Sequence, residues 1–90
     1  MSLIIRQSSR FRRDVKRLLG RGVDASKLKT VIEALVNQKP LDDRYRDHSL
    51  VGVWKGYREC HVQPDWLLIY RVTPDELQLV RTGSHSELFG

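Results

Sequence analysis

The chain has 90 residues, of which 40% are hydrophobic, and its 16 Lys and Arg against 11 Asp and Glu give a formal net charge of +5. This length predicts a single domain over residues 1–90 and excludes a second one. No charge block, repeat or Ser/Pro tract indicates disorder, and the one cysteine, Cys60, excludes an internal disulfide. We therefore expect a cytoplasmic globular protein without a membrane segment.

Positive charge is concentrated at the start of the chain. Residues 1–21 contain one acid, Asp14, and seven basic side chains: Arg6, Arg10, Arg12, Arg13, Lys16, Arg17 and Arg21. A basic balance of this kind favours nucleic acid or an acidic protein as the partner. Among these side chains, we expect Arg12, Arg13 and Lys16 to contact RNA phosphates. The alternative is a solvated basic surface that binds no partner.

The first half of the chain predicts one strand and two amphipathic helices. Residues 3–6 are apolar and β-branched, which is typical of a short strand. Ser8 or Ser9 can cap a first helix that ends at Gly20 and Gly22, and Asp24 can cap a second that ends before Pro40. The apolar faces are predicted to consist of Phe11, Val15, Leu18 and Leu19 in the first helix and Leu28, Val31, Ile32, Leu35 and Val36 in the second.

The second half of the chain changes from a helical to a strand-like pattern. Residues 40–50 are polar and aperiodic, which predicts a loop, whereas residues 53–62 alternate weakly and residues 66–72 and 76–81 are typical of strands. The turns between these strands are short, so neighbouring strands are expected to be antiparallel. The prediction is an α+β fold with an N-terminal strand, a two-helix hairpin and a three-strand antiparallel meander that completes one sheet. Helices would cover one face and leave the other open to a ligand, and residues 85–89 would form a short tail.

All three histidines lie in the strand-forming half. His48 ends the loop, His61 precedes the turn that holds Asp65, and His85 follows the last strand. RNA cleavage needs a base for the 2′-OH proton and an acid for the leaving 5′ oxygen, and histidine suits both because its unperturbed pKa is about 6.5. Asp65 can orient a histidine. A single histidine is usually an ordinary surface residue, but three around one sheet, together with an aspartate, indicate a catalytic set.

Three further side chains are suited to RNA binding. Arg81 can hold a phosphate with two hydrogen bonds, and Trp66 and Phe89 can stack on bases. For Trp66, core packing is an equally good interpretation, because this residue starts the most strand-like run. Phe89 lies one residue from the end of the sequence, where an aromatic ring is hard to bury.

A metal site is the rival interpretation of the same histidines and carboxylate. No HxH or HExxH spacing occurs, and Cys60 would point to the opposite face of a strand from His61. The sequence has neither a nucleophile elbow nor a phosphate-binding glycine loop. We therefore expect neither a metal nor a cofactor.

Ordered motifs run through the second half of the chain. They are residues 47–50 (DHSL), 52–58 (GVWKGYR), 61–70 (HVQPDWLLIY), 81–85 (RTGSH) and 88–89 (LF). This series resembles the YafQ branch of the RelE/ParE toxin superfamily, densely over residues 47–90 and only by pattern before them. The functional residues of that branch match His48, His61, Asp65, Trp66, His85 and Phe89 in this sequence.

The resemblance implies a type II toxin–antitoxin toxin that cuts mRNA in the ribosomal A site. Its partners would be the ribosome with its rRNA, mRNA, and a cognate antitoxin that silences it. We expect His85, in a flexible tail, to be the general acid and His48 or His61, oriented by Asp65, to be the base. The alternative is a non-enzymatic ParE-like toxin or RNA-binding module, in which the histidines would have no role.

Overall fold

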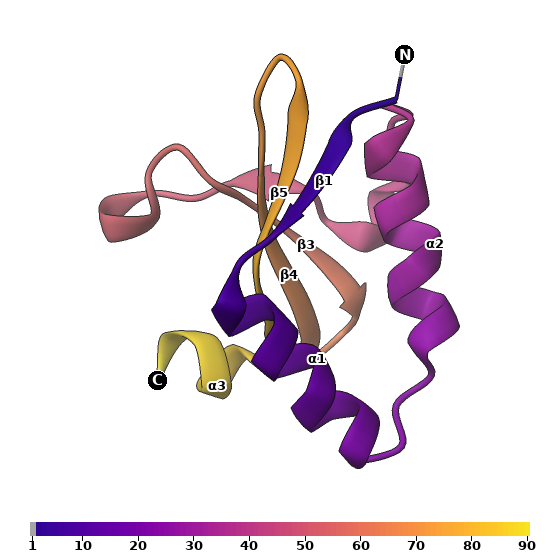
Figure 1. Ribbon diagram of the computed structural model, residues 1–90. Coiled ribbons are helices and arrows are strands. Elements are labelled where there is room, and N and C mark those ends of the chain that lie inside the picture. Colours follow the sequence, from indigo (N-terminus) through magenta and orange to yellow (C-terminus); the bar gives the residue numbers. More distant parts are fainter. Residues whose placement is uncertain (1) are drawn as a thin grey trace.

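The computed structural model describes residues 2–90, which form one five-stranded sheet with helices on its faces (Figure 1). The strands are β1 (Ile4–Gln7), β2 (His48–Ser49), β3 (Arg58–Gln63), β4 (Trp66–Val72) and β5 (Glu76–Gly83). The helices are α1 (Ser9–Gly20), α2 (Ala25–Val36) and α3 (His85–Phe89), with short 3-10 turns η1 (Asp43–Tyr45) and η2 (Gly52–Trp54).

The sheet has the order β1-β5-β4-β3-β2, with β1 parallel to β5 and every other pair antiparallel. The predicted α+β arrangement is therefore confirmed: an N-terminal strand, a helical hairpin and an antiparallel meander share one sheet. The predicted helix caps are also present. Ser8 accepts the backbone N–H of Phe11 at 2.9 Å, and Asp24 accepts that of Ser26 at 3.0 Å.

The main core lies between α1 and α2 and one face of the sheet. Phe11, Leu18, Val31 and Leu35 from the helices pack with strand residues such as Leu68, and each is buried. Leu19 is 50% exposed, so its predicted place on the buried face of α1 is wrong. One helical step from Leu18 rotates this side chain by about 100°, which takes it past the edge of the buried stripe.

The opposite face of the sheet is only partly open, which corrects the expectation of a free face. Leu67 and Ile69 of β4 form a second, smaller cluster there with Leu88 of α3 and the half-buried Trp54 and Tyr57. The weak alternation over residues 53–57 predicted a strand that does not form. That segment contains the end of η2 and a turn, and β3 begins only at Arg58.

Two short elements were predicted as loop or tail. Residues 48–49 pair with β3 as the edge strand β2, and residues 85–89 form α3. Ser84 caps α3 in a reciprocal arrangement, since its side chain accepts the N–H of Glu87 while the Glu87 side chain accepts the N–H of Ser84. No helix within residues 2–90 is long and apolar enough to cross a membrane.

Candidate active site

His48 and His61 lie side by side on adjacent strands at the edge of the sheet. β2 and β3 pair so that His48 is opposite Glu59, and the two imidazole ring centroids are 6.4 Å apart. Arg58 holds this edge together, because its guanidinium donates to Ser49 Oγ at 2.8 Å and to Asp47 Oδ1 at 3.3 Å. The residues that flank His48 are thus fixed against β3.

A buried carboxylate separates the two histidines. Glu59 is 5% exposed, and its Oε1 lies 3.5 Å from Nε2 of His48 and 3.4 Å from Nε2 of His61. Glu59 was not among the residues selected from the sequence. The sequence did contain a signal for Glu59: side chains two positions apart on a strand lie on the same face, so Glu59 shares a face with His61.

Backbone carbonyls determine which ring nitrogen of each histidine carries the proton in the neutral form. Nδ1 of His48 lies 2.6 Å from the carbonyl oxygen of Arg46, and Nδ1 of His61 lies 3.2 Å from that of Pro64. A carbonyl oxygen can only accept a hydrogen bond, so both Nδ1 atoms carry the proton. In the neutral rings the lone pair is then on Nε2, next to Glu59. A ring that takes up a proton at Nε2 gains a carboxylate partner there.

Asp65 contacts His85 rather than the other histidines. Its Oδ1 accepts the backbone N–H of His85 at 3.0 Å, at the first residue of α3. The prediction that Asp65 orients His48 or His61 is therefore wrong. Pro64 and Asp65 are consecutive residues of the β3–β4 turn, so one turn holds the ring of His61 and the backbone of His85.

His85 lies on an anchored helix, so the expectation of a flexible tail is also wrong. Leu88 is buried beneath α3, and Glu87 forms ion pairs with Arg21 and Arg17 of the α1 region. The hydrogen bond from Arg21, followed by that from the Ser84 backbone, lowers the pKa of Glu87 to about 2. The backbone of α3 is thereby tied to α1, while the side chain of His85 stays in solvent.

Two aromatic residues expected to bind RNA, Phe89 and Trp66, have different surroundings. Phe89 is 37% exposed and packs its ring against His85, at 5.1 Å between centroids, and edge-on against Trp54. Trp66 is only 5% exposed and donates its indole N–H to Thr82 Oγ1 at 2.9 Å. The expectation that Trp66 stacks on a base is corrected, since its ring belongs to the core.

Arg81 is bound within the protein instead of being open to a phosphate. Its Nε and Nη2 lie 2.7 and 3.1 Å from the carboxylate oxygens of Asp14, and its side chain is 16% exposed. Burial raises the pKa of Asp14, but hydrogen bonds from Arg81, Arg17 and the Thr82 backbone outweigh burial and lower it overall. The expectation that Arg81 holds RNA is thus replaced by a role in joining β5 to α1.

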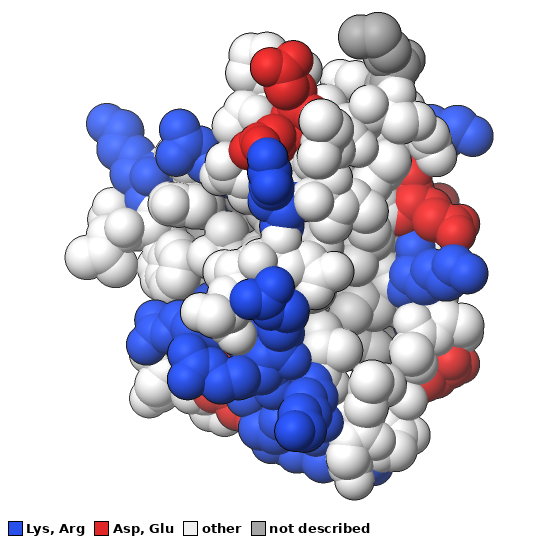
Figure 2. All heavy atoms as spheres, viewed as in Figure 1, with Lys and Arg blue, Asp and Glu red and all other residues white. Residues whose placement is uncertain are grey.

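Arg12, Arg13 and Lys16 are exposed on α1, as expected for a nucleic-acid contact. Figure 2 shows Lys and Arg side chains gathered over α1 on this face of the molecule. Within residues 2–90, no three or more His, Cys, Asp or Glu side chains form a group that could hold a metal ion. Burial raises the pKa of Cys60 to about 12, so this thiol is not a nucleophile near neutrality.

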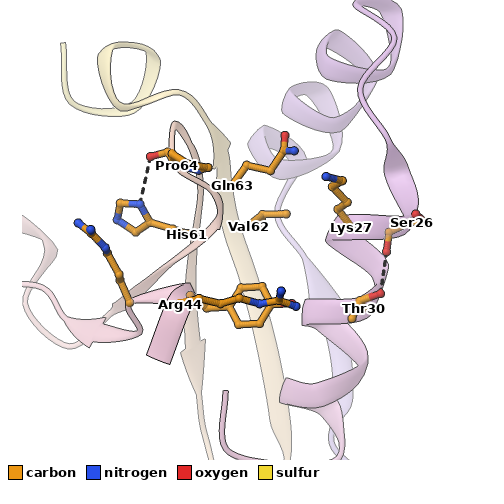
Figure 3. Close-up of a pocket in the computed structure, with 10 residues that line it drawn as sticks. Ser26, Lys27, Thr30, Arg44, His61, Val62, Gln63 and Pro64 are labelled. Carbon is orange, nitrogen blue, oxygen red and sulfur yellow. Dashed lines mark hydrogen bonds between the residues drawn. The ribbon is translucent and has the colours of Figure 1, made fainter. Parts of the chain in front are cut away.

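Two hollows flank the β3–β4 turn. The larger, a groove of about 690 Å³, is lined by the start of α2, by residues 44–46 and by residues 61–64 (Figure 3). The smaller, of about 420 Å³, is lined by Asp65 and Ser84 and shares Gln63 and Pro64 with the groove. A strand of nucleic acid lying over this turn would therefore pass His61 on one side and the start of α3 on the other.

The five-stranded sheet with a helical hairpin on one face is consistent with the fold of RelE-like toxins. Comparison with known proteins identifies the family within that group. A family model described as "Bacterial toxin of type II toxin-antitoxin system, YafQ" matches residues 3–90. The chain belongs to this YafQ family.

Individual relatives agree with the family match. The mRNA interferase toxin YafQ of Escherichia coli strain K12 is 47% identical over 87 residues, which cover 96% of this chain and 95% of the relative. The crystal structure of the E. coli DinJ-YafQ toxin-antitoxin complex matches with a TM-score of 0.92 and 45% identity, covering 100% of both chains. A metal-bound toxin from Helicobacter pylori matches with a TM-score of 0.90 and 44% identity, covering 99% of this chain and 100% of that one.

Proposed function

We propose that this chain is a single-domain endoribonuclease toxin that cleaves mRNA on the ribosome, without a metal, by histidine acid–base catalysis. The observation that carries the proposal is the position of His61 and His85 on either side of one turn, each held by a neighbouring residue of that turn. The name mRNA interferase, given to the E. coli relative, supports the same reaction class. Inhibition of translation would follow from loss of the message.

The proposed reaction is attack by the 2′-OH on the adjacent phosphate. Nε2 of His48 or His61 removes the 2′-OH proton, and the resulting imidazolium pairs with Glu59. The 2′ oxygen bonds to phosphorus, the bond from phosphorus to the 5′ oxygen breaks, and His85 donates a proton to that oxygen. The products are a 2′,3′-cyclic phosphate and a 5′-hydroxyl end, and neither a metal nor a cofactor takes part.

The other site residues act through position or stacking. Asp65 holds the backbone of His85, and Phe89 offers its exposed ring to a base next to the scissile phosphate. Trp66 joins β4 to β5 through Thr82, and Arg81 joins β5 to α1 through Asp14, so both act on the fold rather than on the substrate. Substrate contact is therefore assigned to His48, His61, His85 and Phe89.

The proposed partners are the ribosome, mRNA and a cognate antitoxin protein. Arg12, Arg13 and Lys16 on α1 are suited to rRNA, since neutralised phosphates supply most of the affinity of such contacts. An antitoxin is inferred from the family and from the DinJ-YafQ complex of the E. coli relative. Because the proposed substrate is mRNA on ribosomes, the location we propose is the cytoplasm.

The test is cleavage of ribosome-bound mRNA by the purified chain in the presence of EDTA, with analysis of the new RNA ends. We expect full activity with chelator and 2′,3′-cyclic phosphate ends, with Lys29→Gln, an exposed change on α2, as a control of equal activity. Activity that EDTA abolishes and zinc restores would contradict the metal-free mechanism. Inhibition of translation without any cleavage would instead indicate a non-enzymatic toxin or an RNA-binding module.

A further inference from the structure

The larger groove begins at the catalytic histidines and leads away from them. Its lining includes Pro64 and Arg46, whose carbonyl oxygens bind Nδ1 of His61 and of His48. Among residues 2–90, β3 has no strand partner on its β2 side beyond residue 59, so the groove follows this free edge toward α2. Figure 3 shows His61 on one side of the end of β3 and Lys27 of α2 on the other.

The groove is strongly basic. Its lining includes Lys27, Arg44 and Arg46, which are all exposed, and no Asp or Glu. The acids nearest to these side chains in the sequence are Asp24, Asp43 and Asp47, and none of the three lines the groove. Asp24 accepts hydrogen bonds from Ser26, and Asp47 accepts them from Arg58. The three positive charges therefore have no carboxylate among the lining residues to neutralise them.

The Arg44 guanidinium is held in place before any ligand arrives. It lies 4.8 Å above the centroid of the Tyr45 ring and donates to the Tyr45 hydroxyl at 2.8 Å. Tyr45 in turn packs against the main core. An arginine fixed in this way loses less side-chain entropy when it binds an anion than a free one does.

We propose that this groove binds the phosphodiester backbone of single-stranded RNA next to the scissile phosphate, with Lys27 and Arg44 as the phosphate ligands. The inference rests on the proposed ribonuclease function and names the part of the substrate that the histidines do not reach. Continuity with the catalytic histidines favours RNA, because the groove lining includes His61 itself and Arg46, whose carbonyl oxygen binds His48. An acidic segment of the antitoxin is the competing occupant.

The test uses a charge-removing double variant and RNA with single neutral linkages. Lys27→Gln/Arg44→Gln removes the two proposed ligands, and Lys29→Gln/Lys39→Gln makes the same charge change at exposed positions outside the groove lining. Arg46 is left unchanged because its backbone, which has a φ of 48° and whose carbonyl binds His48, could shift if the side chain were replaced. Single-turnover cleavage is measured on ribosomes that carry a set of mRNAs. In each mRNA, one non-scissile phosphate near the cut is replaced by an uncharged methylphosphonate.

We expect the groove variant to cleave unmodified mRNA about tenfold more slowly than the control variant at subsaturating protein. At least one neutral linkage should slow the wild type and the control by a similar factor and cause no further loss in the groove variant. That lack of additivity would identify the phosphate that Lys27 and Arg44 bind.

Two results would overturn the proposal while leaving the ribonuclease intact. In the first, every neutral linkage that slows cleavage slows the groove variant by the same factor as the wild type. The two losses would then multiply, which would mean that the charges and the phosphates act independently. The other is cleavage by the groove variant equal to that of the control together with weakened antitoxin binding, which would assign the groove to the antitoxin. Failure of the wild type to cleave any mRNA would refute the ribonuclease itself, and the RNA groove with it.

Discussion

The carboxylate of Asp65 accepts the backbone N–H of His85, so the β3–β4 turn holds the first residue of α3. The contact joins two positions that are 20 residues apart. It gives Asp65 a role that needs no contact with substrate, because it fixes the helix from which His85 and Phe89 extend. His61 is held by the preceding residue of the same turn, Pro64.

We expect Asp65→Ala to lower the single-turnover cleavage rate about 10-fold to 100-fold, because α3 would lose one of the bonds that position His85. Asp65→Asn keeps an acceptor oxygen for the His85 N–H and should retain most of the rate. The measurement is the cleavage rate of both variants at saturating ribosomes. Equal, large losses in the two variants would show that the charge of Asp65 acts directly and would contradict a positioning role.

Glu59→Gln should reduce the cleavage rate about tenfold with little change in ribosome binding. Glutamine keeps the size of Glu59 but removes the carboxylate that pairs with an imidazolium at His48 or His61. The comparison is with Glu33→Gln, an exposed change on α2. A Glu59→Gln protein with an unchanged rate across the pH range would show that the carboxylate contributes nothing to the base.

Glu87 makes a pH-dependent contribution to stability. Its pKa is lowered from 4.5 to about 2 in the folded chain, chiefly by Arg21, so its ion pairs stabilise the fold above about pH 4.5 and are lost as pH falls toward 2. Glu87→Gln should therefore be less stable than wild type at pH 7, and the difference should shrink near pH 2. Denaturant unfolding of both proteins at several pH values measures this, and a difference that grows on acidification would contradict the assignment.

The basic face of α1 is predicted to supply ribosome affinity. Changing Arg12, Arg13 and Lys16 together to Gln should weaken binding and lower the salt dependence, by about 0.7 to 0.9 in the log–log slope for each rRNA phosphate that is no longer neutralised. Lys29→Gln/Lys39→Gln serves as a partial control for net charge. If the salt slope of the triple variant matches that of the wild type, the three charges form only a solvated face.

The sequence was sufficient to predict the meander and the helical hairpin because each has a clear period or cap signal over several residues. Strand β2 could not be predicted this way, since two residues show no period. Its pairing depends on Arg58 reaching back to Asp47 and Ser49. Helix α3 is also too short for periodicity, but Ser84 followed by Glu87 is a capping-box pattern that would have indicated its start.

Within the site, residue types were more predictable than their partners. The exposed positions of Phe89 and His85 agree with the expectations from the sequence, whereas Trp66 and Arg81 are held by Thr82 and Asp14. The Arg81–Asp14 pair is 67 positions apart, so only the folded sheet brings it together. Glu59 could have been predicted as well, because it lies two residues before His61 on a strand and such residues share one face.

His85 is the general acid in the proposed mechanism, and this is its central claim. An imidazolium acid loses activity as pH rises, and a neutral histidine base loses activity as pH falls, so the wild-type rate should be bell-shaped in pH. His85→Ala should lower the rate about 10²-fold to 10⁴-fold and remove the alkaline limb of the bell. Folding should be retained, because the His85 side chain is exposed and α3 is anchored through Leu88 and Glu87.

The most direct measurement is single-turnover mRNA cleavage by wild type and His85→Ala on saturating ribosomes, over about pH 5 to 9. Ser86→Ala, one residue further along α3, serves as the matched control and should keep the bell-shaped profile. We predict a slow His85→Ala enzyme whose rate no longer falls at alkaline pH. A His85→Ala protein that cleaves at nearly the wild-type rate, or that loses only ribosome binding, would contradict the mechanism and assign the acid to another group.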